Sequence, residues 1–243
     1  MKKPIGIQLY SVRDALAKDF EGVIAKIAAM GYDGVETAGL PAGITPEKAC
    51  QIIKKNGLKI SSAHCGLPVG DNQKRIIDEI MTLGCKTLVS GKGQNDFKTE
   101  ELIKQSCAAF NRAAAALKQN GLRFAIHNHW WEFQNLGTTP VYQLMLKELD
   151  PAVLFEVDTY WVKTAGADPV QVVKELGKRA PRLHIKDGPC QQGQPMTAVG
   201  KGTMDFPPIL KAATHAEWLI VELDACATDM LEAVKESLTY LKK

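Results

Sequence analysis

The chain has 243 residues, a formal net charge of +3 and a charged fraction of 23%, which are ordinary values for a globular protein. The small charge and the scattered basic residues argue against nucleic acid as a partner. No apolar run reaches the roughly 18 residues of a membrane span, and the amino terminus lacks a signal-peptide pattern. We therefore expect no membrane partner and a cytoplasmic location, although a signal peptide removed from a precursor would leave no trace.

The first predicted helix has apolar residues at helical spacing, namely Phe20, Val23, Ile24, Ile27 and Ala28. It ends at Gly31, which suits the left-handed position that closes a helix. A short aliphatic run follows, too short for a helix and typical of a buried parallel strand. The same order of amphipathic helix, glycine and short apolar run recurs around Gly57, Gly84 and Gly121.

Eight strands are predicted, and helical segments separate them all; they lie near residues 4–10, 33–37, 58–64, 86–91, 122–128, 152–157, 182–186 and 217–223. Strict alternation of strand and helix favours a parallel sheet. Eight such units in a chain of this length predict a single α/β domain, a (β/α)8 TIM barrel over residues 1–243. A doubly wound open sheet is the structural alternative. The longest non-periodic stretch, residues 187–206, follows strand seven and is interpreted as an active-site loop.

Six cysteines form no CxxC pair and have no regular spacing: Cys50, Cys65, Cys85, Cys107, Cys190 and Cys226. This pattern indicates free thiols in a reducing compartment and gives no support to a zinc finger or a redox motif.

In a TIM barrel the chemistry lies at the carboxyl ends of the strands. Polar side chains occupy most of these predicted ends: Gln8, Tyr10, Glu36, His64, Ser90, His127, His129, Glu132, Asp158, His184, Lys186 and Glu222. Four of the five histidines of the chain are in this set. Each has a simpler explanation, such as a hydrogen-bonded core histidine, or a turn capped by Asp158.

Taken together, carboxylates and an imidazole from the last four strands would converge on one barrel mouth. They predict one divalent metal ion, either Mn, Zn, Co or Mg, held by Glu132, Asp158, His184 and Glu222.

Several motifs in order resemble the sugar phosphate isomerase/epimerase family of xylose-isomerase-like TIM barrels: "GIQLYSVRD", "GYDGVE", "SSAH", "HNHWWEF", "FEVDTYW", "LHIKD" and "VELD". The resemblance covers essentially the whole chain. It implies a divalent ion bound by Glu, Asp, His and Glu from strands five to eight. The last three map onto Asp158, His184 and Glu222, whereas many relatives have Glu-Asn-His where this chain has His127-Asn128-His129. Either His127 replaces the first glutamate or Glu132 reaches back from the loop, and the second hypothesis is preferred here.

The resemblance implies a sugar or keto-sugar substrate. The ion would stabilise an enediolate formed when a C–H beside a carbonyl loses its proton, giving an isomerase or epimerase. Proton transfer is assigned to His127, His129 and Glu222, with Lys186 binding a substrate oxygen or stabilising negative charge. Substrate contacts are predicted for Gln8, Tyr10, Glu36, His64, Trp131 and Trp161.

Other functions use the same fold. Loss of a β-hydroxyl or glycosyl group would make the protein a keto-sugar or inosose dehydratase, or lyase. A non-catalytic sugar-binding protein and a DNA-repair endonuclease are weaker alternatives, since the first needs no base and the second needs more ligands and a basic face. A homo-oligomer is compatible with the sequence. "VGKG" at Val199–Gly202 is a weak candidate for a phosphate loop, and an unphosphorylated or keto sugar is preferred.

Overall fold

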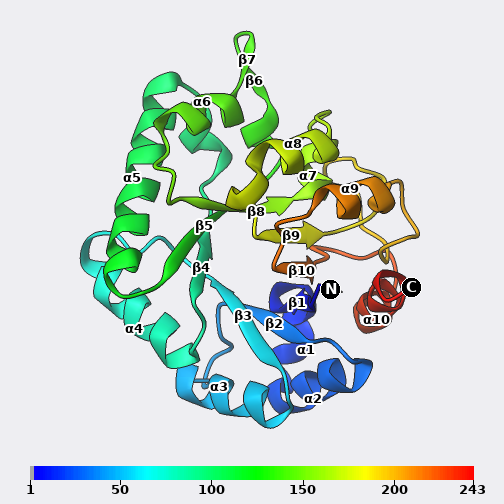
Figure 1. Ribbon diagram of the computed structural model, residues 1–243. Helices are drawn as coiled ribbons and strands as arrows, with labels where there is room; N and C mark the ends of the chain where they lie inside the picture. The colour runs from blue at the N-terminus through cyan, green and yellow to red at the C-terminus, as the bar shows by residue number, and fades with distance from the viewer. Residues whose placement is uncertain (1–2) are drawn as a thin grey trace.

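Eight short segments form the parallel strands of a closed barrel in the computed structural model, which describes residues 3–243 (Figure 1). The strands are β1 (Ile5–Gln8), β2 (Gly34–Ala38), β3 (Lys59–His64), β4 (Thr87–Ser90), β5 (Arg123–His127), β8 (Leu154–Asp158), β9 (Arg182–Ile185) and β10 (Trp218–Val221). The barrel closes because β1 pairs with both β2 and β10. The predicted TIM barrel is confirmed, and an open doubly wound sheet is excluded.

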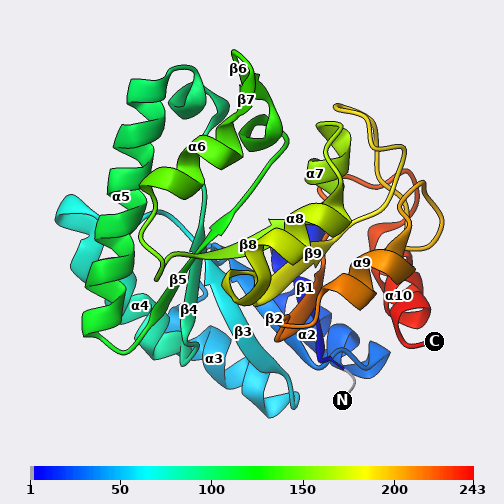
Figure 2. The ribbon, with the colours of Figure 1, turned by 45° about the horizontal axis from the view of Figure 1, so that its top comes forward.

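Helices surround the barrel on its outside, as the two ribbon views show (Figure 2). They are α1 (Arg13–Leu16), α2 (Phe20–Met30), α3 (Pro46–Lys55), α4 (Gln73–Leu83), α5 (Glu100–Gln119), α6 (Val141–Glu148), α7 (Thr159–Thr164), α8 (Pro169–Leu176), α9 (Phe206–Ala212) and α10 (Met230–Leu241). The predicted helix end at Gly31 is confirmed, because this residue closes α2 with φ 94°.

Short 3-10 turns lie in the connections: η1 (Leu9–Val12), η2 (Gly70–Asn72), η3 (Gln94–Phe97), η4 (Trp131–Phe133) and η5 (Gly177–Arg179). Between β5 and α6 the chain also forms a small antiparallel hairpin, β6 (Asn135–Leu136) and β7 (Thr139–Pro140), which projects from the top of the molecule in Figure 1. The hairpin was not predicted, because two residues per strand are too few to show periodicity.

The lower part of the barrel interior is filled by unusual side chains. The Trp218 ring occupies space that Gly34 leaves, since a Cβ on Gly34 would lie 2.9 Å from that ring. Arg182, which pairs with Trp218 in the register of β9 and β10, is 2% exposed and donates hydrogen bonds to Ser62 Oγ (3.1 Å) and to the Ser61 carbonyl (2.6 Å). Because barrel interiors are usually aliphatic, a polar floor of this kind indicates that it supports polar groups nearer the mouth.

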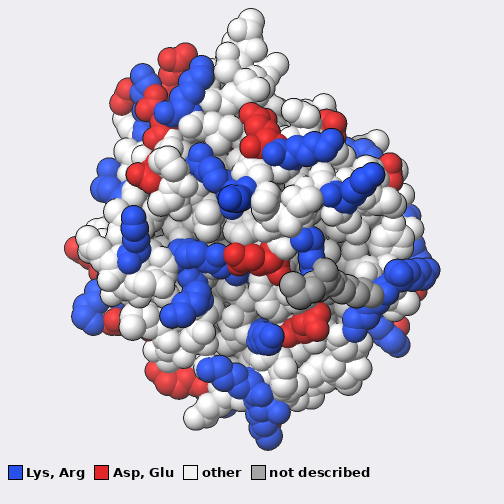
Figure 3. All heavy atoms as spheres, in the orientation of Figure 1, with Lys and Arg blue, Asp and Glu red and all other residues white. Residues whose placement is uncertain are grey.

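The surface carries basic and acidic side chains together, in keeping with the small net charge of +3. Lys and Arg are interspersed with Asp and Glu over the face of the molecule in Figure 3. Within residues 3–243, no helix is long and apolar enough to cross a membrane.

All six cysteines are unpaired, as predicted. Burial raises the pKa of the Cys65 and Cys107 thiols to about 12, which keeps both protonated near neutral pH.

Candidate metal centre and substrate pocket

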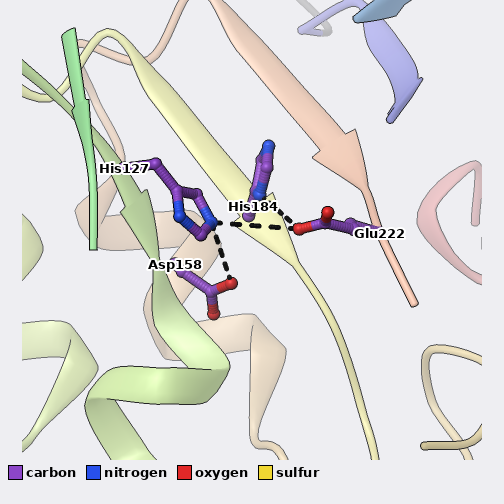
Figure 4. Close-up of side chains that lie close together, drawn as sticks. All are labelled: His127, Asp158, His184 and Glu222. Carbon is purple, nitrogen blue, oxygen red and sulfur yellow. Dashed lines mark ion pairs between the residues drawn. The ribbon is translucent and has the colours of Figure 1, made fainter. Parts of the chain in front are cut away.

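Four buried side chains meet at the carboxyl ends of β5, β8, β9 and β10 (Figure 4). His127, Asp158, His184 and Glu222 each offer one ligand atom, and these atoms all lie within 4.8 Å of one another. His127 Nε2 lies 3.4 Å from Asp158 Oδ2 and 3.9 Å from Glu222 Oε2. His184 Nδ1 lies 2.7 Å from Glu222 Oε2. The structure therefore brings together three of the four predicted metal ligands, with His127 beside them.

The atoms that face one another in this group make no hydrogen bond of standard geometry, although the two carboxylate oxygens also lie near Lys186 Nζ, at 3.0 Å for Asp158 and 2.7 Å for Glu222. Both ring nitrogens of His127, Asp158 Oδ2, His184 Nδ1 and Glu222 Oε2 are buried without a well-formed hydrogen bond to any described residue. Buried polar atoms are normally satisfied, so each exception calls for an explanation. Two imidazole nitrogens and two carboxylate oxygens are a suitable donor set for a first-row divalent ion. The residues present thus fit the ion that the sequence predicts.

Glu132, the predicted first ligand, lies outside this group. Its Oε2 accepts a hydrogen bond from the His129 backbone N–H at 2.8 Å, and its Oε1 lies 4.0 Å from His129 Nδ1. Burial, together with the nearby His184 and His129, holds the pKa of His127 well below its usual range. His127 is therefore a neutral imidazole with a free lone pair, the form that binds metal.

Asn128 holds Asp158 in place by joining β5 to β8. Its Oδ1 accepts from the Asp158 N–H (2.9 Å), and its Nδ2 donates to the Asp158 carbonyl (3.2 Å). Asp158 Oδ1 caps α7 by accepting from the Trp161 N–H at 2.9 Å, which leaves Oδ2 to face His127 Nε2 in the candidate ligand group. Both predicted roles of Asp158, the cap and the place in the cluster, are thus met by different oxygens.

Lys186 is 1% exposed and lies among three carboxylates. Its Nζ is 2.7 Å from Glu222 Oε2, 3.0 Å from Asp158 Oδ2 and 2.9 Å from Asp224 Oδ2. Burial opposes its charge, but the three carboxylates outweigh burial and raise the pKa of Lys186 well above its usual value. Asp224 was missed at the level of the sequence, although it stands two residues after Glu222 in the quoted motif "VELD".

A second layer of carboxylates supports His184 from below. His184 Nε2 lies 2.9 Å from Glu156 Oε2 and 3.2 Å from Glu36 Oε1, opposite the nitrogen that faces Glu222. Burial and the neighbouring Glu36 raise the pKa of Glu156 to about 7. Glu156 was also missed, although it stands two residues before Asp158 on β8 and so faces the same side of the strand.

A cavity of about 440 Å³ opens above the metal group. It is lined by Gln8, Tyr10, Ala38, His64, His127, His129, Trp161, Lys186, Glu222 and Asp224. Four of the predicted substrate contacts, Gln8, Tyr10, His64 and Trp161, are among these residues. Glu36 and Trp131 are not. Glu36 is fully buried and accepts hydrogen bonds from Gln8 and Ser62, whereas Trp131 stacks on the His129 ring at a centroid distance of 4.0 Å.

The loop after β9 is organised by the fully buried Asp187. Its Oδ2 accepts from the N–H groups of Gly200 and Gly202, both at 2.9 Å. Its Oδ1 accepts from Gly188 (2.8 Å) and Met204 (3.1 Å). The lining of the cavity includes no residue of the loop, so the predicted active-site loop lies beside the cavity and not in its wall.

Comparisons with known proteins agree with this fold. A sequence model of the xylose isomerase-like TIM barrel family matches residues 24–243. No curated protein matches the sequence. Two crystal structures of sugar phosphate isomerase/epimerases from Parabacteroides distasonis ATCC 8503 each have a TM-score of 0.83. The first is 29% identical in sequence, and the match covers 99% of this chain and 98% of that protein. The second is 26% identical, and the match covers 99% of this chain and 93% of that protein. The IOLI protein with a bound zinc atom is 13% identical, with a TM-score of 0.75 and coverage of 98% and 97%.

Proposed function

Since the chain belongs to the xylose isomerase-like TIM barrel family, we propose that it is a divalent-metal-dependent sugar isomerase or epimerase. The observation that carries the proposal is the buried group of two imidazoles and two carboxylates at the floor of the cavity. The cavity volume of about 440 Å³ falls in the range of small-molecule sites. The names of the two Parabacteroides distasonis structures support the same class of reaction.

In this proposal His127, Asp158, His184 and Glu222 hold one ion. When bound, the ion supplies Lewis-acid stabilisation for negative charge on the sugar oxygens. Two imidazole nitrogens in the donor set favour zinc, manganese or cobalt over magnesium, which prefers oxygen ligands. The name of the IOLI structure, which has this fold and a bound zinc atom, supports a metal in this chain.

Proton transfer is assigned to Glu222 and His129, which both line the cavity. His129 has a side chain that is 30% exposed, and its ring is held between Trp131 and the edge of His127, with a ring distance of 4.9 Å to the latter. Glu132 fixes the backbone of His129 through its hydrogen bond. An imidazole can act as a general acid or base, and so can remove or return a proton beside a carbonyl. Return to the opposite face of the same carbon gives an epimer, and return to the next carbon gives an isomer.

The remaining cavity residues orient the sugar. Gln8 uses its amide oxygen to accept from the Tyr10 N–H (3.1 Å) and its amide nitrogen to donate to Glu36, so its orientation is fixed. Tyr10 and Trp161 present aromatic surface to the C–H faces of a sugar. Lys186 Nζ lies 5.5 Å from the centre of the Trp161 ring and next to the carboxylates of Asp158 and Glu222. From this position its ammonium group can donate a hydrogen bond to a substrate oxygen that approaches the two carboxylates.

The test is a panel of keto-sugars incubated with Mn²⁺-loaded protein in D2O and analysed by mass spectrometry after the ion is removed. Deuterium uptake with rearranged but saturated products supports the proposal. An unsaturated product would identify the alternative, elimination by a dehydratase or lyase. Sugar binding without any deuterium uptake would identify a non-catalytic binding protein.

A further inference from the structure

The loop that follows β9 bears on which sugars the cavity accepts. In TIM barrels a phosphate group often binds at the loops after strands seven and eight, and backbone N–H groups are common phosphate donors. Here Gly200 and Gly202, in the stretch "VGKG", donate their N–H groups to Asp187 Oδ2 at 2.9 Å each. A carboxylate of the protein itself therefore already occupies the position that a phosphate oxygen would take.

This arrangement is built into the loop. Asp187 is fully buried and accepts two more N–H groups, those of Gly188 and Met204. A Cβ on Gly202 would lie 2.1 Å from Asp187 Oδ1, so only glycine permits this close approach. Releasing the N–H groups to a ligand would leave a buried carboxylate without its donors, which is unfavourable.

The charged side chains around the cavity also provide no free positive charge to bind a phosphate dianion. Lys186 is the only lysine or arginine among the lining residues, and its Nζ lies within 3.1 Å of Asp158, Glu222 and Asp224. Three carboxylates against one ammonium group leave two negative charges, which one divalent ion neutralises. Phosphate recognition normally uses arginine, lysine or free N–H groups, and the lining has no such cation to spare.

Basic side chains on the segments that follow β1, β8 and β9 are engaged elsewhere. Arg13 donates to the carbonyls of Tyr10 (2.9 Å) and Asp224 (3.1 Å). Lys163 donates to the Thr203 carbonyl, and Lys201 forms an ion pair with Glu236 at 2.7 Å. Each of these three side chains therefore already donates to an oxygen of the protein, and Lys201 also has its charge paired with a carboxylate.

We infer that the site takes a neutral, unphosphorylated sugar, even though the similar Parabacteroides distasonis structures carry the name sugar phosphate isomerase/epimerase. The inference rests on the proposed function and deepens it by naming the substrate class. Tyr10 and Trp161 supply aromatic faces for the sugar ring, and Asp224 supplies a carboxylate that accepts from hydroxyl groups and repels a phosphate.

The inference is tested with matched pairs, each a neutral ketose and its phosphate ester at the carbon farthest from the carbonyl. Deuterium uptake at limiting sugar concentration, with the Mn²⁺-loaded protein, gives kcat/KM for both. The ester should react at least about 100-fold more slowly, in line with the cost of placing like charges together. An ester that reacts equally well or better would overturn the inference while the proposed function stands. No uptake from either member of any pair would overturn both.

Asp224→Asn tests the electrostatic part with a readout that general damage does not move, the ratio of kcat/KM for the neutral sugar to that for its ester. This ratio should fall about tenfold, because one unit of negative charge leaves the cavity wall. Asp205→Asn is the matched control, since Asp205 is exposed and lies outside the cavity; its ratio should equal that of the unmodified protein. An unchanged ratio in Asp224→Asn would overturn the electrostatic argument.

Discussion

The His127 ring lies close to other imidazole rings, with its centroid 4.7 Å from that of His184 and 5.1 Å from that of His64. Burial disfavours a charge on His127, and the neighbouring imidazoles would repel one, so its pKa is held well below the usual range. A glutamate at this position would instead add a third carboxylate to Asp158 and Glu222. The histidine therefore makes the site less negative and shifts the donor set from oxygen toward nitrogen.

A pair of variants tests which residue completes the metal site. His127→Ala should lower affinity for Zn²⁺ or Mn²⁺ at least about 100-fold, beyond the usual effect of a residue that only supports a ligand. Glu132→Gln should keep the affinity near that of the unmodified protein, because Glu132 contacts the His129 backbone and not the metal group. Metal content after dialysis measures both. The reverse pattern would return the ligand role to Glu132.

A second prediction concerns Glu156, which touches His184 on the side away from the ion. Carboxylates behind a ligating histidine fix its orientation and raise its basicity. Glu156→Gln should therefore weaken metal binding by about 10–100-fold while the four ligands remain. Titration with a chelating dye measures the affinity, and Glu101→Gln on the exposed start of α5 serves as control. Unchanged affinity in Glu156→Gln would show that Glu36 alone orients the ring.

At the scale of elements, the loop of residues 187–206 is organised largely around one side chain, that of Asp187. It contains no regular helix or strand before α9, yet four of its N–H groups converge on Asp187. The loop also passes close to α10, where the Val199 N–H donates to Ser237 Oγ at 2.9 Å. A long segment without regular structure is thereby fixed against the barrel instead of remaining open above the cavity.

Removing that carboxylate should loosen the loop measurably. Asp187→Ala should lower the free energy of unfolding by about 3 kcal/mol, because hydrogen bonds to a charged group contribute roughly 1.5–3 kcal/mol each and water replaces only some of them. Urea denaturation followed by circular dichroism measures the change. Asp205→Ala, at the exposed end of the same loop, should change stability by less than about 0.5 kcal/mol. Equal effects of the two substitutions would contradict the role of Asp187.

The helices and strands also show which features of the structure can be predicted from the sequence. Glycine-terminated helices and short apolar runs predict all eight barrel strands and place Asp158, His184 and Glu222 at their ends. They do not predict which side chains meet across the barrel, because contacts depend on the register between strands, such as His127 opposite Glu156. Glu132 lies in the turn η4, where strand alternation no longer applies and local backbone geometry directs the carboxylate to His129.

At the scale of the whole molecule, closing the barrel brings distant parts of the chain to one place. Gln8 and Glu222 line the same cavity although more than 200 positions separate them, because β1 pairs with β10. Arg182 and Trp218 fill the interior below, so the polar groups of the site rest on a packed floor. A ligand bound by residues at the ends of β5, β8, β9 and β10 therefore contacts four of the eight barrel strands. Its binding should stabilise the whole folded barrel against unfolding.

The last prediction measures this linkage. An ion that binds only the folded protein stabilises it by about 2.7 kcal/mol at a free concentration of 100 Kd. For a chain of this size, such a stabilisation corresponds to a Tm increase of roughly 5–10 °C. Calorimetry with Zn²⁺ or Mn²⁺ added, compared with EDTA, should show this increase in the unmodified protein and in Glu132→Gln. It should be absent in His127→Ala and Asp158→Ala, whose Tm in EDTA shows independently whether the barrel still folds. An equal increase in all four proteins would place the ion elsewhere and refute the assignment of the site.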